Sequence, residues 1–440
     1  MEPTMSLGVF LLPGGHHPSA WRVPDGPVPD PCDIDYVASL ASLAEHGGFH
    51  FLFLADSDAL WRSDGAALRR DPNAFGLEPL TLLSALSRST ETLGLVATVS
   101  TSYHDPYSVA RRLSSLDHLS RGRAGWNIVT SFMPQVAANF GGSALPAHDR
   151  RYERAEEFMN VVDGLWRLWG HGIVTRDRAS GNYLAHGEIP TLDHSGPHFA
   201  VRGPLNQPPS PQSRPLLVQA GSSPAGMSFA ARWSEVVFTV ESDLDSSART
   251  RARFHELLAG AGRVPGEVRL MPGLLVLVED TDEQAWRVLD RLQSMVDPHL
   301  GLVQLKDYGF PIDMTEHSWS DPVPAVRGDA DGQQGRQEVL RRIAAAREMS
   351  IEQLARYVAF TRGHNLLVGS AERVADEMER WWRAGACDGF NVMPARLPLD
   401  LERFSASVVP LLRDRGVLTA PRPGWTLREQ LGLTLSPVDR

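Results

Sequence analysis

Cysteine is scarce in this sequence, and the two that occur, Cys32 and Cys387, lie far apart and form no C-x-x-C pair. A disulfide framework and a zinc site are therefore not expected, and a reducing compartment fits. Long apolar runs are also missing, since no segment approaches the ~20 apolar residues that a membrane helix needs. The basic region of a signal peptide is absent from the first residues, MEPTMSLGVFLLPGG. We expect a soluble, cytoplasmic protein with no membrane partner.

Several signatures of binding and catalysis are missing as well. The formal net charge is -10 and no run of Lys and Arg occurs, which argues against a nucleic-acid partner. The spacings of serine hydrolases (G-x-S-x-G) and zinc hydrolases (H-E-x-x-H) do not occur. No close pair of carboxylates follows an apolar run, although a glycosidase needs such a pair. The chemistry is therefore expected to come from a bound cofactor.

Eight apolar runs do recur, each followed by a polar loop and a helix-like pattern. They are residues 7–12, 48–56, 93–101, 122–131, 214–221, 234–240, 268–278 and 388–394. Because the runs are continuous and do not alternate with polar residues, they indicate strands buried on both faces, as in a parallel sheet. Eight strand–helix units predict an α/β fold of the (β/α)8 TIM-barrel type. A doubly wound sheet is the alternative, but no G-x-G-x-x-G follows the first run.

Two spacings are too long for plain strand–helix units. Residues 170–214 are rich in Pro, Gly and His, and residues 297–365 hold a polar stretch followed by the helical pattern IEQLARYVAF. Long insertions in a compact domain are usually lids, binding loops or disordered segments. We therefore expect one domain over residues 1–440 with these two insertions, and residues 297–365 are the candidate lid.

The active site of such a barrel lies at the carboxyl ends of its strands. The residues that follow the apolar runs are hydroxyl, amide, imidazole and glycine groups, with a single carboxylate. They are Gly14, Gly15, His16, His17, Asp56, Thr98, Ser100, Thr101, Asn127, Thr130, Ser131, Gly221, Ser222 and Ser223.

The stretch QAGSSPAGMSFAARW, residues 219–233, leaves the fifth run and opens a helix. Gly221 permits close approach of the backbone to a ligand, while Ser222 and Ser223 offer hydroxyls and backbone N–H groups. Pro224 suits the first turn of a helix, whose N-terminus carries partial positive charge. Together these features predict a phosphate cradle. A serine N-cap without a ligand is the alternative.

A second helix supports the same interpretation. In HDRRYERAEEFMNVVDGLWRLW, residues 148–169, His148 and Tyr152 are spaced i and i+4 and share one face. Both side chains could reach the same anion at the barrel mouth. An exposed histidine and a packed tyrosine is the alternative.

At this point the chain resembles a known family. The motifs RAGWNIVTS, HDRRYERAEEF, RGPLNQPPSPQSRPLLVQAGSS and VADEMERWWRAGACDGFNVMP are similar to those of the bacterial-luciferase-like flavin monooxygenases. The branch it resembles is the nitrilotriacetate monooxygenase component A type, with the long-chain alkane, dibenzothiophene-sulfone and pristinamycin-pathway enzymes. The likeness runs nearly end to end.

The resemblance implies a (β/α)8 barrel and a two-component monooxygenase that uses O2 and reduced FMN (FMNH2). A separate NAD(P)H:FMN reductase would supply the flavin, and a flavin 4a-peroxide would oxygenate a small organic substrate. Family members are commonly homodimers or higher homo-oligomers. Two alternatives from the same superfamily stay open: a deazaflavin-dependent oxidoreductase and a non-catalytic flavin-binding protein. A sugar-phosphate barrel enzyme is a third, disfavoured by the missing lysine or carboxylate pair.

The resemblance also implies roles for single residues. Asp56 matches a position that approaches the flavin ring, and Thr98 one that contacts it. His148, Tyr152, Ser222 and Ser223 match the group around the ribityl phosphate. Asn127 would orient the oxygen adduct beside the ring. His17 is the candidate to hydrogen-bond the peroxide or to donate a proton, with lining of the substrate pocket as the alternative.

Three positions depart from the pattern of the family. Val23 stands where histidine is usual, His104 where asparagine is frequent, and Met227 where arginine is frequent. Val23 and His104 are expected on the substrate side of the cavity, so they bear on substrate identity more than on flavin binding.

Overall fold

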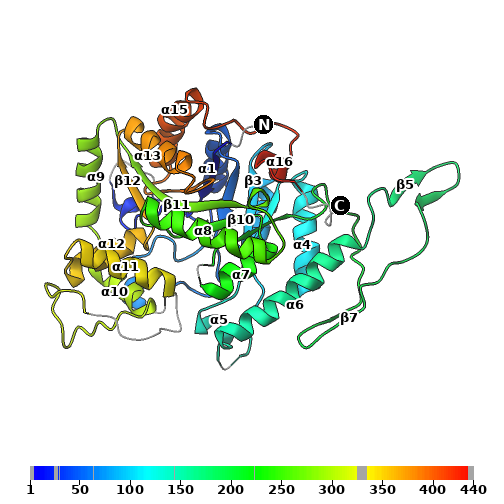
Figure 1. Ribbon diagram of the computed structural model, residues 1–440, viewed down its shortest axis with the longest axis horizontal. Helices are drawn as coiled ribbons and strands as arrows, with labels where there is room; N and C mark the ends of the chain where they lie inside the picture. Colours follow the sequence, from blue (N-terminus) through cyan, green and yellow to red (C-terminus); the bar gives the residue numbers. More distant parts are fainter. Residues whose placement is uncertain are drawn as a thin grey trace.

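Eight parallel strands close into a barrel that helices surround (Figure 1). The computed structural model describes residues 4–23, 28, 30–62, 64–142, 144–221, 223–324 and 334–434. The barrel strands are β1 (Ser6–Phe10), β2 (Phe51–Leu54), β3 (Gly94–Ser100), β4 (Ala124–Val129), β9 (Leu216–Gln219), β10 (Val236–Thr239), β11 (Arg269–Val278) and β13 (Gly389–Pro394). Every strand lies within one of the eight predicted runs or begins one residue before it. The predicted (β/α)8 barrel is therefore confirmed.

The barrel closes through three parallel pairings among its first strand and its last three strands. β1 pairs with β13 from Ser6↔Gly389 onward, and β13 pairs with β11. The first half of β11 pairs with β10, from Val236↔Arg269 to Thr239↔Pro272. These pairings leave no free edge between the first and the last strand, so all eight carboxyl ends meet around one mouth.

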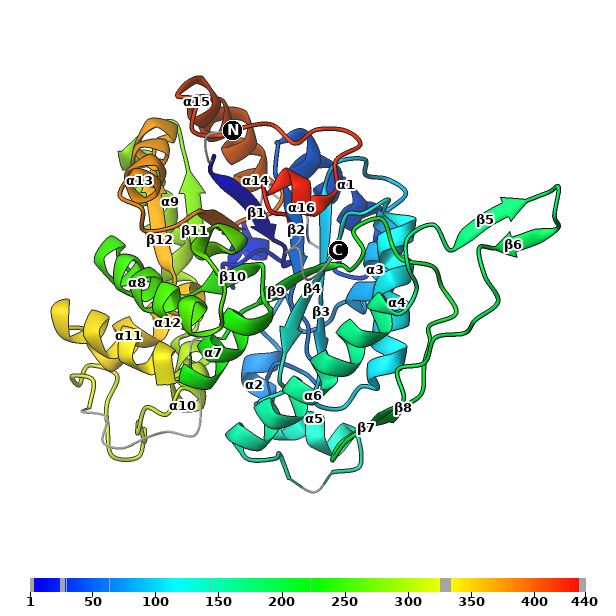
Figure 2. The ribbon, with the colours of Figure 1, turned by 45° about the vertical axis from the view of Figure 1, so that its right-hand side comes forward.

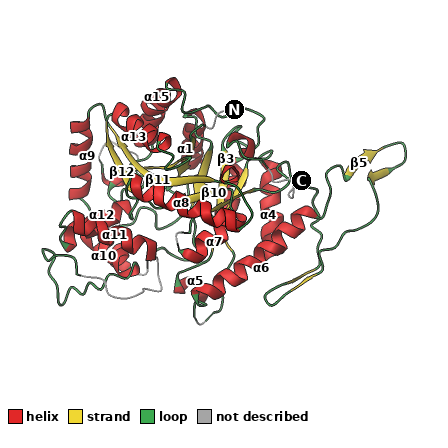
Figure 3. Cartoon of the chain, in the orientation of Figure 1, coloured by secondary structure: helices red, strands yellow, loops and turns green. Residues whose placement is uncertain are grey.

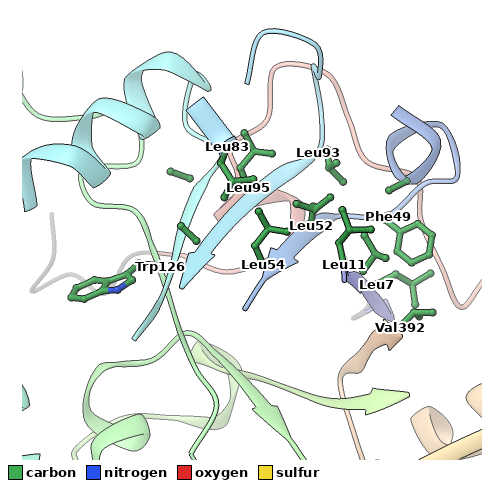
Figure 4. Packing of buried hydrophobic residues seen from close by; sticks show 14 of the residues in the cluster. Leu7, Leu11, Phe49, Leu52, Leu54, Leu83, Leu93, Leu95, Trp126 and Val392 are labelled. Atoms are coloured by element: carbon green, nitrogen blue, oxygen red, sulfur yellow. The ribbon is translucent and has the colours of Figure 1, made fainter. Parts of the chain in front are cut away.

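Both faces of the strands are buried, which explains their continuous apolar sequences. In β2, Leu52 and Leu54 pack in the layer between barrel and helices, whereas Phe51 and Phe53 pack in a second cluster with residues of the barrel interior. Figure 4 shows part of the outer layer, where Leu7, Leu52 and Leu95 of neighbouring strands lie together.

The helices follow the strands as the pattern predicts, and Figure 3 shows them around the strands. Asp33 caps the start of α1 by accepting hydrogen bonds from the N–H groups of Asp35 and Tyr36. The helix ends at the predicted glycines, and Gly48 adopts a φ of +82°, which glycine allows. The helices outside the insertions are α1 (Ile34–His46), α2 (Gly65–Leu68), α3 (Pro79–Leu86), α4 (Pro106–Leu119), α5 (Pro134–Asn139), α6 (His148–Arg167), α7 (Pro224–Trp233), α8 (Leu244–Gly260), α9 (Asp282–Ser294), α13 (Ala371–Arg383), α14 (Leu399–Arg403), α15 (Val409–Asp414) and α16 (Leu427–Gln430), with the short turns Ala20–Arg22 and Pro265–Glu267 and a π-helical turn at Phe404–Val408.

The insertion at 170–214 forms two small antiparallel hairpins. One pairs β5 (Val174–Asp177) with β6 (Asn182–Leu184), and the other pairs β7 (His194–Ser195) with β8 (Ala200–Val201). Figures 1 and 2 show the first hairpin projecting away from the barrel. It therefore lies away from the barrel mouth.

The insertion at 297–365 forms a helical layer with its own core. It contains α10 (Pro298–Asp307), α11 (Gln334–Ala346) and α12 (Ile351–Thr361), whose buried side chains include Leu305, Leu340 and Leu354. The polar stretch expected to be the working part of a lid, residues 327–335, lies largely outside the described residues. The lid and the single domain stay predictions.

One strand was not expected from the sequence. β12 (Asn365–Gly369) pairs with residues 274–278 of β11, beyond the point where the pairing of β11 with β10 stops. β11 has ten residues and extends past the barrel wall, so it offers a further stretch of backbone to pair.

In the part of the chain that the structure describes, no helix has both the length and the apolar composition to cross a bilayer.

We expect Gly301→Ala to lower the free energy of unfolding by about 1–3 kcal/mol, because a Cβ at Gly301 of α10 would lie 1.7 Å from the carbonyl oxygen of Ala355 in α12. The two helices would have to move apart. Urea unfolding followed by circular dichroism would measure the change. Gly260→Ala is the matched control, since a Cβ at this helical glycine meets nothing within 4 Å. Equal stability of the two variants would contradict the close helix contact.

Candidate active site

A cavity of about 740 Å³ opens at the carboxyl ends of the barrel strands, and this volume lies within the usual range for ligand sites. Its wall is built from strand-end residues together with residues of the helical insertion. The strand-end residues include Phe10, Phe53, Asp56, Thr98, Asn127, Gln219 and Phe238, and the insertion contributes Gln304, Asp307, Arg336, Ala359 and Arg362. The predicted location of the site is the location of this cavity.

One end of the cavity gathers hydroxyl, imidazole and phenol groups around the start of α7. The Oγ of Ser223 accepts a hydrogen bond from the N–H of Gly226 at 3.1 Å and so caps the helix. The Nε2 of His148 lies 3.3 Å from the same Oγ, and the ring centroids of His148 and Tyr152 are 5.0 Å apart. Burial raises the pKa of Tyr152, and hydrogen bonds to Ser223 and Thr130 oppose this shift. The three predicted side chains are therefore together.

Two glycines lie beside these side chains, one packed against them and one in the cavity wall. A Cβ on Gly226 would lie 2.8 Å from the hydroxyl oxygen of Tyr152 and 3.2 Å from the Oγ of Ser223. Gly221, in the loop before α7, also lines the cavity, and its N–H donates to the Oε1 of Gln219 at 2.7 Å. Ser222 lies outside the described residues. The start of α7 is thus a concave cradle at a helix N-terminus, where an anion is favoured.

A short hydrogen-bond chain joins the ends of three strands. The Nδ2 of Asn127 donates to the Oγ1 of Thr98 at 2.8 Å, and that hydroxyl donates to the carbonyl oxygen of Leu54 at 2.6 Å. The Oδ1 of Asn127 is buried and has no hydrogen-bond partner among the described residues. An orphaned acceptor at a cavity wall fits a ligand that presents an N–H group.

Asp56 is an acidic group of the wall with an altered titration. Burial raises its pKa to about 6, the nearby carboxylates of Asp58 and Glu78 add to the shift, and His104 opposes it. The Nε2 of His104 lies 3.2 Å from the Oδ1 of Asp58. A carboxyl group with a pKa near 6 can both take up and release a proton around neutral pH.

Of the two adjacent histidines after β1, His16 lines the cavity and His17 does not. His17 is fully buried beside Phe360, with ring centroids 4.6 Å apart, and its Nδ1 accepts a hydrogen bond from the N–H of Ser19. Burial, aided by Arg396, lowers the pKa of His17 to about 3. Its predicted catalytic role stays a prediction, and the structure places it apart from the cavity wall.

The interior wall is apolar and aromatic. The ring of Phe10 lies 5.1 Å from that of Phe53 and 5.9 Å from that of Phe238, and His364 stacks on Phe238 at 5.3 Å. Such a wall offers area to a flat ring system and keeps water from it.

The three positions that depart from the family pattern differ in place. His104 lines the cavity, whereas Val23 and Met227 are not among its lining residues. Met227 packs between α7 and α8.

Sequence reasoning missed the basic groups that the insertion brings to the wall, Arg336 and Arg362. Arg362 ends α12 directly before the unexpected strand β12. The signal that could have placed Arg362 was the short apolar run NLLVG after TRGH, which is typical of a turn leading into a strand.

Within the described ranges, no group of three or more His, Cys, Asp or Glu side chains could hold a metal ion.

The model of the family described as luciferase-like monooxygenase matches residues 5–388. The chain is 41% identical over 438 residues to the N-acetyl-S-(2-succino)cysteine monooxygenase of Bacillus subtilis (strain 168), covering 99% of this chain and 98% of that protein. It is 39% identical to the nitrilotriacetate monooxygenase component A of Aminobacter aminovorans, covering 98% and 96%.

A solved structure agrees with these sequence relatives. The EDTA monooxygenase of Chelativorans sp. BNC1 superposes with a TM-score of 0.83 at 31% identity, covering 98% of each chain. The likeness therefore extends over the barrel and both insertions.

Proposed function

The chain belongs to the luciferase-like monooxygenase family and is a flavin-dependent monooxygenase, and on this premise we propose that its cavity binds reduced flavin mononucleotide (FMNH2) supplied by a separate NAD(P)H:FMN reductase. In this reaction class one oxygen atom of O2 enters the substrate and the other leaves as water, while oxidised flavin is released. Reduced flavin, when bound, supplies the two electrons and two protons that this balance requires. The observation that carries the proposal is the anion cradle at the start of α7, which opens into an aromatic cavity.

The phosphate would be held by Ser223, Tyr152 and His148 at the N-terminus of α7. The hydroxyls and N–H groups donate hydrogen bonds to an anion, and the helix N-terminus adds a favourable field. The close fit of Gly226 against Tyr152 and Ser223 supports this assignment, because any side chain there would push these two groups out of position.

The ring would lie against strand-end residues. Asn127 has a buried Oδ1 available to accept an N–H, and Thr98 fixes the orientation of that amide through its hydroxyl. Phe10, Phe53 and Phe238 exclude water, which favours transfer of oxygen to the substrate over loss of hydrogen peroxide. Asp56 can hold or accept a proton at its carboxylate.

We propose that a separate reductase serves this enzyme and that the chain forms a homodimer or higher homo-oligomer, as the resemblance to the family implies. One relative carries the name component A, which supports a system of two components. The two relatives and the solved neighbour described above are all named monooxygenases. This favours oxygenation over the deazaflavin-dependent and the non-catalytic alternatives.

Anaerobic fluorescence titration with photoreduced FMN, photoreduced riboflavin and a reduced deazaflavin cofactor tests the proposal. We expect FMNH2 to bind at least about tenfold more tightly than reduced riboflavin, because charged hydrogen bonds to the phosphate contribute about 1.5–3 kcal/mol each. Tyr152→Phe and Ser223→Ala should each lower the ratio of FMNH2 affinity to reduced-riboflavin affinity about tenfold.

Ser223→Ala also removes a helix N-cap, so Ser370→Ala, which removes the cap of α13, is its control. The control should leave flavin affinity unchanged. Tighter binding of the deazaflavin, or equal affinity for FMNH2 and reduced riboflavin, would overturn the proposal.

A further inference from the structure

Arg362 brings a guanidinium to the cavity wall from the junction of α12 and β12. One of its terminal nitrogens donates to the Nδ1 of His16 at 2.5 Å. Among the residues that the structure describes, no carboxylate forms an ion pair with it. Its backbone adopts a φ of 50°, a left-handed conformation that is unfavourable for non-glycine residues.

His16 cannot balance the charge of Arg362. The Nε2 of His16 pairs with the carbonyl oxygen of Phe10 at 2.9 Å, so it carries the proton and leaves Nδ1 as the acceptor. Burial, followed by the charge of Arg362, lowers the pKa of His16 well below its ordinary value. The imidazole is therefore neutral at physiological pH, and the guanidinium keeps an uncompensated positive charge.

A second guanidinium lies in the same wall, and within the described ranges it forms no ion pair with an acidic side chain. Arg336 of α11 donates to the hydroxyl of Tyr308 at 3.1 Å, and its Cζ lies 5.8 Å from the centre of that ring. Burial lowers the pKa of Arg362 to about 10, and the positive charges of Arg336 and Arg62 add to this shift. Arg362 nevertheless stays charged at neutral pH.

The nearby acids do not cancel this charge. Asp71 is already paired with Arg62, at 2.5 Å between Oδ2 and Nε. Asp307, also in the wall, is a poor counter-ion because burial raises its pKa, although Arg62 opposes the shift. This side of the cavity is therefore positively charged and largely shielded from bulk solvent, where an unpaired charge is unfavourable.

Resting on the function proposed above, we propose that Arg362, with Arg336 beside it, binds a carboxylate of the substrate, so that the enzyme oxygenates a carboxylate-bearing compound. The planar fork of a guanidinium matches a carboxylate with two parallel hydrogen bonds. The flavin phosphate is served elsewhere, by Ser223 and Tyr152 at the starts of α7 and α6. Figures 1 and 2 both show α6 and α10–α12 on different sides of the barrel mouth.

Isothermal titration calorimetry on the full chain saturated with oxidised FMN tests this inference. The probes are N-acetyl-S-(2-succino)cysteine and nitrilotriacetate, the trimethyl ester of each, and neutral dibenzothiophene sulfone. We expect at least one acid to bind tenfold or more tightly than its ester, with affinity falling as salt rises. Arg362→Gln should weaken binding of that acid at least tenfold, change ester affinity less than threefold, and leave the melting temperature equal or higher. Arg362→Lys should recover part of the loss.

Arg341→Gln is the matched control, since Arg341 lies on α11 and pairs with Glu338 at the exposed surface. It should bind the acid as the unchanged protein does. The inference is overturned if no acid binds more tightly than its ester, if dibenzothiophene sulfone binds more tightly than both acids, or if Arg362→Gln weakens acid and ester equally. FMN affinity of each variant is measured in parallel. Loss of FMN binding with Arg362-dependent acid binding intact would refute the proposed function alone.

Discussion

Replacement of Gly226 by valine is expected to weaken binding of flavin mononucleotide about a hundredfold or more, which corresponds to roughly 3 kcal/mol. The physical reason is the space at the start of α7. The Cβ alone would contact the Tyr152 hydroxyl at 2.8 Å and the Ser223 Oγ at 3.2 Å, and the two methyl groups of valine extend further. The side chain would push apart Tyr152 and Ser223, the two groups that we assign to the phosphate.

Comparison of two flavins makes this prediction specific. Riboflavin has no phosphate, so its affinity should change much less in Gly226→Val, and the preference for FMN over riboflavin should disappear. Fluorescence quenching titrations with the two flavins measure both quantities. Gly260→Val is the control, because it places the same β-branched residue at a helical glycine where a Cβ meets nothing within 4 Å. If Gly226→Val retained the preference for FMN, the phosphate would have to bind elsewhere.

Replacement of Arg428 by methionine is expected to lower the free energy of unfolding by about 3–5 kcal/mol, because it leaves a buried carboxylate without its partner. The Nε of Arg428 donates to the Oε1 of Glu235 at 2.6 Å, and both side chains are almost fully buried. The other Glu235 oxygen accepts the N–H of Leu217 at 3.0 Å. The pair thus fastens α16, near the end of the described chain, to β9 and β10.

The pH dependence of this stabilisation has a defined sign. Burial alone would raise the pKa of Glu235, but Arg428 and Arg214 lower it from its ordinary 4.5 to about 2. A carboxyl whose pKa is lower in the folded state than in the unfolded state contributes full stability above about pH 4.5. This contribution is lost as the pH falls toward 2. The difference in the free energy of unfolding between the unchanged protein and Arg428→Met should therefore shrink over that interval, as the pH falls from about 4.5 toward 2.

Urea unfolding at pH 7 and at several acidic pH values measures both effects. The double variant Glu235→Leu/Arg428→Met should recover much of the loss, since apolar replacement of both partners avoids the stranded charge. A single variant as stable as the unchanged protein at pH 7 would show that the pair contributes little to folding.

The barrel could be predicted from sequence because its information is local. Each strand is a continuous apolar run, and each helix such as α1 or α7 carries its own cap residue, Asp33 or Ser223. The exception is β12, an additional strand that lies outside the closed barrel and within a predicted insertion. Its pairing depends on how far β11 extends past the barrel, which no local pattern specifies.

The arrangement of side chains at the start of α7 was predictable for a related reason. Ser223 caps α7, and His148 and Tyr152 share a face of α6, so their approximate orientation follows from helix geometry. Local geometry did not predict which of the two adjacent histidines faces the cavity. Since neighbouring side chains diverge, one of His16 and His17 had to leave the cavity, and only the packing of His17 against Phe360 decided which one.

The sequence by itself thus determined the eight-stranded parallel barrel and the place of its mouth, and it predicted the residues of the proposed anion cradle, because apolar runs, helix caps and i, i+4 spacing act over a few residues. Only the tertiary structure decided what faces that cradle. Arg362 and His16 are separated by more than three hundred residues, and they meet because the helices of the insertion pack beside the barrel mouth. Contacts of this kind depend on the whole arrangement of layers, so the charge of the substrate side could not be inferred from any single stretch of chain.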